Sequence, residues 1–126
     1  MPKGKIVVVD NEIYITNILD FSLGMDGYQV ITAHDGLAAL NKARSERPDL
    51  IVTDDLMPLM DGYDLVRELK ADPELRTTPV VMIAQLPGSR SAREAEGLGV
   101  EEFISKPFSP RGLVNAINEL LAKKVS

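Results

Sequence analysis

Residues 48–62 read PDLIVTDDLMPLMDG, and a fold prediction can begin from this stretch. Its apolar run, residues 50–53, follows Pro48 and stops abruptly at Asp54. A short apolar run bounded by a breaker and a charge is typical of a strand that is buried on both faces of a sheet. Asp61 then offers an N-cap for a helix. The stretch therefore predicts a buried strand, a loop that begins with acids, and a helix.

Two further apolar runs end on charged residues in the same way. Residues 6–9 stop at Asp10, and residues 103–105 stop at Lys106. In a parallel sheet the carboxyl ends of the strands share one edge, where α/β proteins place their sites. The sequence therefore predicts that Asp10, Asp54 and Lys106 meet at one point, although they are far apart in the chain.

Short apolar runs alternate with helical patterns along the whole chain, which indicates βαβ units around a parallel sheet. The predicted strands are residues 5–9, 28–33, 50–53, 80–84 and 102–105. Five helices follow them, the fourth being a weaker pattern over residues 89–98. The other four are predicted to bury Ile15, Ile18 and Leu19; Ala39, Leu40 and Ala43; Leu65, Val66 and Leu69; and Leu113, Val114, Ile117, Leu120 and Leu121. Right-handed crossovers place helices on both faces, so we expect a three-layer α/β/α fold.

Composition excludes several classes of protein. The chain has 126 residues, which fits one domain over residues 1–126, and we expect no separate output domain within it. It has no cysteine, which excludes disulfides, thiolate catalysis and cysteine-ligated zinc. A net charge of −5 argues against direct binding to nucleic acid. No apolar run approaches the ~20 residues that cross a bilayer, and the N-terminus has no signal-peptide pattern. We therefore expect a cytoplasmic protein without membrane contact.

The three charged residues suit phosphoryl transfer to a carboxylate. A carboxylate can attack a phosphoryl group and hold it as an acyl phosphate. This chemistry needs charge neutralisation, for which Mg²⁺ with oxygen ligands is suited, and a lysine can add a point charge. Asp54, Asp10 and Lys106 can supply the nucleophile, a metal ligand and that charge.

On these residues the chain resembles the receiver domain of bacterial two-component response regulators, along essentially its whole length. Four stretches carry most of the resemblance, and their order and spacing are together highly specific: VVVDNE at 7–12, PDLIVTD at 48–54, MPLMDG at 57–62 and KPF at 106–108. The resemblance implies a flavodoxin-like sheet of five parallel strands in the order 2-1-3-4-5.

The resemblance also implies the function. Asp54 would accept a phosphoryl group from a sensor histidine kinase or a phosphotransfer protein, and Lys106 would contact that group. The peptide bond before Pro107 would be cis. The receiver would signal through the surface around the fourth helix, fifth strand and fifth helix to a downstream protein or output domain that the sequence does not identify. The oligomeric state stays open, and a phosphorylation-dependent homodimer is one expectation from the family.

In the family, Mg²⁺ is held by acids after the first strand, by the acceptor and by a backbone carbonyl two residues later. Here these ligands would be Asp10, Asn11, Asp54 and the carbonyl of Leu56. Asn11 stands where the family has a second acid, so one formal charge is lost. Because metal affinity depends on ligand charge, we expect weaker Mg²⁺ binding.

A second departure concerns the switch. Residues 80–83 should lead to Thr or Ser, whose hydroxyl bonds the phosphoryl group and couples it to an aromatic residue, here Phe103. This chain has Ala84, which offers no side-chain donor. Asp55, directly after the acceptor, stands where an apolar residue is commoner, and it could point outward or add charge near the site.

Two other functions compete with the switch. Because of Ala84 and Asn11, the chain could be an atypical receiver that acts as a phosphorylation-independent protein-interaction module. Phosphatases of the haloacid dehalogenase type also use a strand-end aspartate, but their pattern is Asp-x-Asp, whereas this chain has Asp10-Asn11-Glu12. We therefore expect that the chain is not an enzyme.

Overall fold

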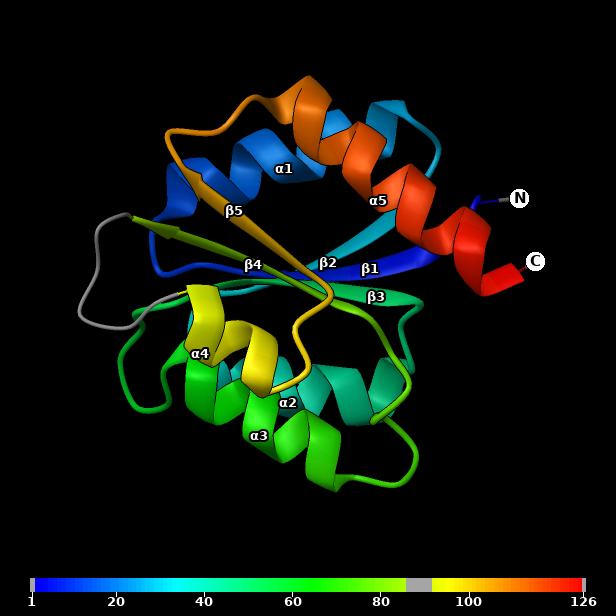
Figure 1. Ribbon diagram of the computed structural model, residues 1–126. Helices are drawn as coiled ribbons and strands as arrows, with labels where there is room; N and C mark the ends of the chain where they lie inside the picture. Colours follow the sequence, from blue (N-terminus) through cyan, green and yellow to red (C-terminus); the bar gives the residue numbers. More distant parts are fainter. Residues whose placement is uncertain (1, 86–91, 126) are drawn as a thin grey trace.

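The computed structural model describes residues 2–85 and 92–125, and the chain alternates between strands and helices throughout these residues (Figure 1). The elements in order are β1 (Lys5–Val9), α1 (Ile13–Met25), β2 (Gln29–Ala33), α2 (Gly36–Glu46), β3 (Leu50–Asp54), α3 (Gly62–Ala71), β4 (Val80–Gln85), α4 (Ala92–Gly97), β5 (Glu102–Lys106) and α5 (Pro110–Val125).

The predicted strands agree with these bounds to within one residue. The second strand begins at Gln29, not at Tyr28, and the last three each extend one residue further than predicted, to Asp54, Gln85 and Lys106. The predicted start of the fourth helix, at residue 89, lies outside the described residues.

The five strands form one parallel sheet in the order β2-β1-β3-β4-β5, as the resemblance implies. β1 has its sequence neighbour β2 on one side and β3 on the other, so the connections diverge between β1 and β3. Such a switch point leaves a crevice at the carboxyl ends of the strands, where α/β proteins bind their ligands. Asp10 follows one of these two strands and Asp54 ends the other.

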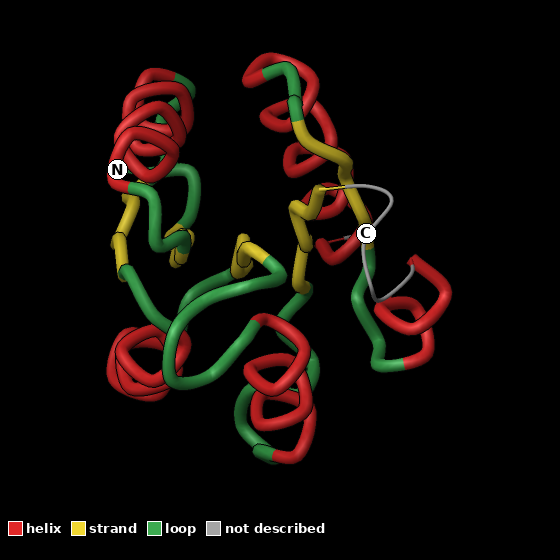
Figure 2. The backbone as a smooth tube through the Cα atoms, turned by 90° about the vertical axis from the view of Figure 1, so that its left-hand side faces the viewer, coloured by secondary structure: helices red, strands yellow, loops and turns green. Residues whose placement is uncertain are grey.

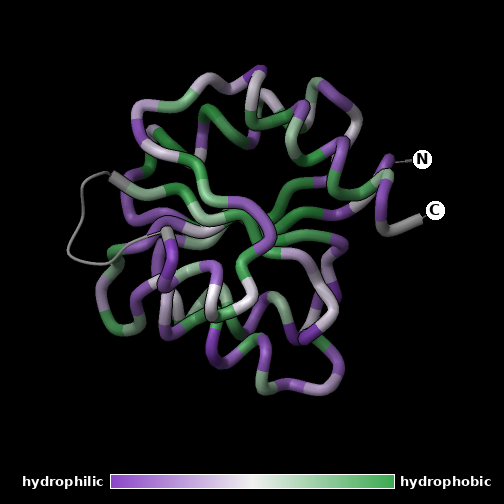
Figure 3. Tube along the Cα trace, viewed as in Figure 1, coloured by the Kyte–Doolittle hydropathy of each residue, from purple (hydrophilic) through white to green (hydrophobic). Residues whose placement is uncertain are grey.

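Alternate residues of each strand enter two separate cores. Ile6 and Val8 of β1 pack with α1 and α5, whereas Val7 and Val9 pack with α2, α3 and α4. Figures 1 and 2 show the resulting three layers, with α1 and α5 on one face of the sheet. Because both faces are covered, the central strands β1, β3 and β4 are mostly apolar, and the hydropathy colouring in Figure 3 shows green along the middle of the sheet.

Most predicted helix faces are confirmed, including all of the predicted inward residues of α2 and α3. Leu113, Val114 and Ile117 of α5 are buried, and Leu120 and Leu121 pack at the edge of the same core. The prediction for Ile18 is wrong, because its residue surface is 39 % exposed. Ile15, Leu19 and Leu23 form the buried row at four-residue spacing, which turns Ile18 to the flank of the helix.

Within the described parts of the chain, no helix has the length and apolar character that a bilayer crossing requires.

Candidate phosphoacceptor site

The structure brings Asp10, Asp54 and Lys106 together, as the sequence predicts. The Lys106 Nζ lies 3.1 Å from Asp54 Oδ1 and 3.4 Å from Asp10 Oδ2. It also lies 3.7 Å from Glu12 Oε1. Both aspartates are buried, with Asp54 only 5 % exposed. One ammonium group is therefore shared by two buried carboxylates from different strands, and Glu12 is a third acid at this site that the prediction did not assign.

Backbone hydrogen bonds fix the orientation of both carboxylates. The Asp55 N–H donates to Asp54 Oδ1 at 2.9 Å, and the Glu12 N–H donates to Asp10 Oδ1 at 2.9 Å. The Asp10 N–H itself donates to the carbonyl of Ala33 at 3.2 Å, which extends the β1–β2 pairing to the site. The acids are thus held by the main chain as well as by Lys106.

Two glycines hold the loop after β3 against the sheet. A Cβ added at Gly62 would lie 2.0 Å from the carbonyl oxygen of Asp54, and one at Gly36 would lie 2.2 Å from that of Met60. The Gly62 N–H donates to the carbonyl of Asp55 at 2.8 Å. Only a residue without a side chain permits this close approach. The side chain of Asp61 caps α3 by accepting from the Asp64 N–H at 2.8 Å, as predicted.

Burial dominates the electrostatics of the site. Burial and, to a smaller extent, a hydrogen bond with the Asp55 side chain raise the pKa of Asp54 against the opposing effect of Lys106, and the net pKa is about 6. Burial also raises the pKa of Asp10, and the charge of Asp54 adds to this effect. Burial lowers the pKa of Lys106, but the two carboxylates outweigh it, so its pKa is raised. Lys106 is therefore firmly cationic, whereas the two acids are held at a cost that an additional cation would reduce.

Asp55, whose orientation the sequence left open, does not point into solvent. It is 9 % exposed, and a hydrogen bond with its side chain raises the pKa of Asp54. It directly follows the last residue of β3, Asp54, which pairs with Ile83 of β4. The structure therefore favours the second alternative, in which Asp55 adds acidity near the site.

The donor set fits a hard divalent cation. Asp10 and Asp54 supply buried carboxylate oxygens, and the Lys106 ammonium between them shows that they can share a cation. Asn11 and Leu56 lie on the exposed loops beside these acids. Among the described residues, no group of three or more His, Cys, Asp or Glu side chains could hold a metal alone. A cation here would have to complete its shell with amide, carbonyl and water oxygens, which Mg²⁺ accepts readily.

The two residues of the expected switch lie on one face of the sheet. Ala84 pairs with Ser105, and Phe103 pairs with Met82, two residues earlier on the same two strands. Ala84 is only 1 % exposed, and Phe103 is half-buried against the core beneath α2, α3 and α4. The peptide bond between Lys106 and Pro107 is cis, as the resemblance implies.

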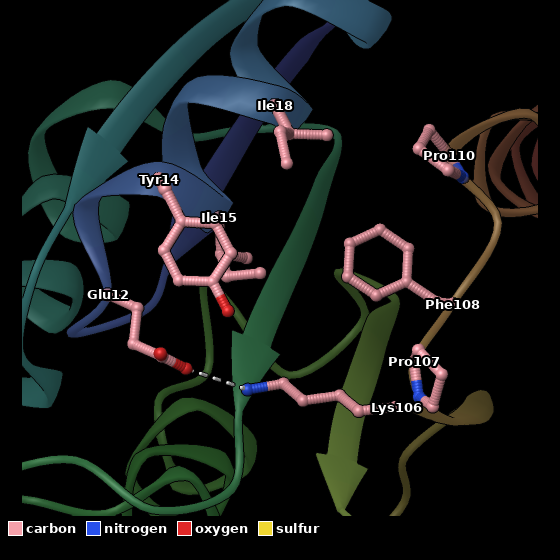
Figure 4. Close-up of a pocket in the computed structure, with 8 residues that line it drawn as sticks. All are labelled: Glu12, Tyr14, Ile15, Ile18, Lys106, Pro107, Phe108 and Pro110. Atoms are coloured by element: carbon pink, nitrogen blue, oxygen red, sulfur yellow. Dashed lines mark ion pairs between the residues drawn. The ribbon is translucent and has the colours of Figure 1, made fainter.

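An open cavity of about 530 Å³ adjoins the site, between α1 and the segment after β5 (Figure 4). Sequence reasoning missed it, because it treated Ile18 as a core residue and did not consider Tyr14. Tyr14 and Ile18 are four residues apart and lie outside the buried row of α1, and this spacing could have indicated a second apolar strip on the helix. The lining residues are Glu12, Tyr14, Ile15, Ile18, Lys106, Pro107, Phe108 and Pro110.

Comparison with known proteins agrees with this geometry. The profile of the response regulator receiver domain matches residues 6–118. The chain is 40 % identical over 121 residues to the probable transcriptional regulator ycf27 of Cyanophora paradoxa, covering 96 % of this chain and 49 % of that protein. It is 36 % identical over 119 residues to the alkaline phosphatase synthesis transcriptional regulatory protein PhoP of Bacillus subtilis (strain 168), covering 94 % and 49 %. The chain thus spans about half the length of the curated relatives it matches.

Solved structures show the same fold over nearly the whole chain. The chemotaxis response regulator CheY4 of Vibrio cholerae superposes with a TM-score of 0.86 at 31 % identity, covering 92 % of this chain and 97 % of that one. A putative response regulator from Chloroflexus aurantiacus J-10-fl superposes with a TM-score of 0.90 at 28 % identity, covering 97 % and 99 %.

Proposed function

Because the chain belongs to the response regulator receiver domain family, we propose that it is a phosphoacceptor switch of a two-component phosphorelay. In this proposal Asp54 accepts a phosphoryl group from a sensor histidine kinase or a phosphotransfer protein in the cytoplasm. The observation that carries the proposal is the Lys106 ammonium, which lies 3.1 Å from Asp54 and 3.4 Å from Asp10.

In the transfer itself the chain supplies the nucleophile, and any proton on the leaving imidazole stays with the donor. A carboxylate oxygen of Asp54 forms a bond to phosphorus while the bond from phosphorus to the donor's leaving atom breaks. Lys106 would contact a phosphoryl oxygen, which is supported by the 3.1 Å distance from its Nζ to Asp54 Oδ1. Burial of Asp54 keeps bulk water away from the acyl phosphate, apart from the side open to the donor.

Mg²⁺ would be held by Asp10, Asn11, Asp54 and the backbone carbonyl of Leu56. When bound, it would neutralise the charge that builds up between the acceptor and the phosphoryl oxygens. The amide of Asn11 supplies an oxygen ligand without a charge, so this set should bind Mg²⁺ more weakly than one with a second acid.

Signalling would proceed through the surface formed by α4, β5 and α5, to an output domain or a separate protein. In this chain Ala84 cannot donate a side-chain hydrogen bond to the phosphoryl group. A hydrogen bond to a charged group is worth about 1.5–3 kcal/mol, so the phosphorylated conformation should be favoured less by that order.

Intact mass after incubation with Mg²⁺ and acetyl phosphate tests the proposal. We expect one phosphoryl adduct on the parent chain and none on Asp54→Asn. Asp55→Asn is the matched control, because it removes the neighbouring carboxylate and should keep the adduct. If the parent gains no adduct at high Mg²⁺, the phosphoacceptor proposal is wrong, and a phosphorylation-independent interaction module becomes the better hypothesis.

A further inference from the structure

The cavity beside the site has the size of a ligand pocket. Its volume of about 530 Å³ lies within the range of roughly 300–1,000 Å³ that is usual for small-molecule sites. It lies on the α1 and α5 side of the sheet, and Lys106 is one of its lining residues. The same side chain that binds the acceptor Asp54 therefore forms one end of this cavity.

The walls of the cavity are apolar and come from two segments that are distant in sequence. Figure 4 shows the rings of Tyr14 and Phe108 on opposite sides of the space, with Ile18 above them. Tyr14 is 59 % exposed and Ile18 is 39 % exposed, so these side chains present apolar surface to the opening and are not simply part of the core. An aromatic ring or a branched alkyl group would bury surface against all three.

The polar groups of the cavity gather at the end near Asp54. The Lys106 ammonium and the Glu12 carboxylate lie 3.7 Å apart there, and the Tyr14 hydroxyl is directed toward them (Figure 4). A phosphoryl group that bridges Lys106 and Asp54 would lie at this end. Because displacement at phosphorus is in line, the leaving group departs on the side of phosphorus opposite the Asp54 oxygen.

We propose that this cavity holds the acyl group of a small-molecule phosphodonor, and that the chain prefers acyl phosphates with a large apolar or aromatic acyl group over acetyl phosphate. This inference rests on the proposed function, since it names the donor class for Asp54. The apolar walls recognise the acyl group, and Lys106 recognises the phosphoryl group. The carboxylate of Glu12 disfavours an acyl group that carries a second negative charge.

The transfer is balanced without any further reactant. An oxygen of the Asp54 carboxylate forms a bond to phosphorus while the bond from phosphorus to the acyl carboxylate oxygen breaks. The departing carboxylate keeps the electron pair of that bond, and no proton is transferred. One mixed anhydride replaces another, so the step needs neither an oxidant nor a reductant.

The experiment measures the second-order rate constant for phosphorylation of Asp54 by benzoyl phosphate and by acetyl phosphate, with Mg²⁺ present, from the growth of the adduct in intact mass. The ratio of the two values is then compared among the parent, Phe108→Ala and Tyr14→Ala. Comparing ratios cancels the different intrinsic reactivity of the donors. Tyr14→Ala complements Phe108→Ala, because Tyr14 is exposed and its truncation does not open the core. Met25→Ala is the matched control, since Met25 is an exposed apolar residue of α1 outside the cavity.

We expect the ratio to favour benzoyl phosphate in the parent and to fall about tenfold in each cavity variant, because an apolar contact of this size discriminates by roughly that factor. The loss should appear as a higher donor concentration at half-maximal labelling rate, since the acyl group is bound before and during transfer. Met25→Ala should keep the parent ratio.

Two results would overturn the inference, and they can be distinguished. If acetyl phosphate labels Asp54 but the ratio is the same in the parent, Phe108→Ala and Tyr14→Ala, the donor class is wrong and the proposed function stands. The cavity would then serve contacts with a protein donor. If neither donor labels Asp54 in the parent, the proposed function fails and the inference fails with it.

Discussion

We predict that Asp54→Asn makes the metal-free protein more stable at pH 7.5. Asp54 is buried beside Asp10 and Asp55, and burial raises its pKa from an ordinary value of 3.8 to about 6. Between these pH values the folded state binds more protons than the unfolded chain. The free energy of unfolding therefore falls as the pH rises through this range, and above pH 6 the protein carries the full cost of the buried charge.

The size of the effect follows from the two pKa values. The difference between about 6 and 3.8 corresponds to about 3 kcal/mol at 1.36 kcal/mol for each pH unit. Asparagine has nearly the same shape and no charge, but it also loses the ionic contact with Lys106. We therefore expect Asp54→Asn to raise the free energy of unfolding by about 1–3 kcal/mol at pH 7.5. This increase should disappear as the pH approaches 4.

Urea denaturation followed by circular dichroism, with EDTA present, measures this difference at a series of pH values. Asp20→Asn is the matched control. It changes the net charge of −5 by the same amount as Asp54→Asn, but at an exposed position of α1. Equal stability of Asp54→Asn and the parent at pH 7.5, or a gain that does not depend on pH, would refute the reasoning. Added Mg²⁺ should stabilise the parent by about 1.4 kcal/mol at ten times its Kd, and should have a smaller effect on Asp54→Asn.

Four further substitutions test other contacts of the site. Lys106→Met leaves two buried carboxylates without their shared cation, so we expect a loss of about 3 kcal/mol at pH 7.5 in urea denaturation, shrinking as the pH falls and the acids take up protons. Gly62→Ala places a Cβ 2.0 Å from the carbonyl oxygen of Asp54, so we expect a loss of about 2–3 kcal/mol, and an unchanged urea midpoint would contradict the close approach. Asn11→Asp should raise the affinity for Mg²⁺ roughly tenfold in calorimetric titration, and an unchanged affinity would remove the charge argument. Ala84→Ser should tighten binding of beryllium fluoride, a mimic of the phosphoryl group, by about 10- to 100-fold in the presence of Mg²⁺, and equal binding would show that the missing hydroxyl is not what limits the switch.

The strands were predictable because local pattern and tertiary environment agree there. The central strands β1, β3 and β4 are covered on both faces and are mostly apolar, so the pattern of residues 50–53 has no competing interpretation as a surface strand. The same logic located the acids and Lys106 at one edge. The helices were less certain, because a helix face depends on what packs against it. Ile18 shows this, since it fits an apolar periodicity but lies 39 % exposed at the flank of α1.

The loop after β3 depends on contacts that no local pattern reveals. Gly62 and Gly36 are required because the backbones of Asp54 and Met60 approach them, and these approaches exist only once the helices are packed. Leu59 adopts a left-handed backbone conformation, with φ of 72°, in the same loop. The presence of a leucine does not predict this backbone conformation, because residues with a Cβ rarely adopt it.

The sequence by itself determined the order of the elements, the parallel sheet and the meeting of Asp10, Asp54 and Lys106, because periodicity and strand ends are local properties that the topology converts into position. Tertiary structure alone decided the orientation of Asp55, the ion pair of Glu12 and the cavity between Tyr14 and Phe108. These features depend on the distances between side chains of different elements, and such distances are set only when both cores are packed around the sheet.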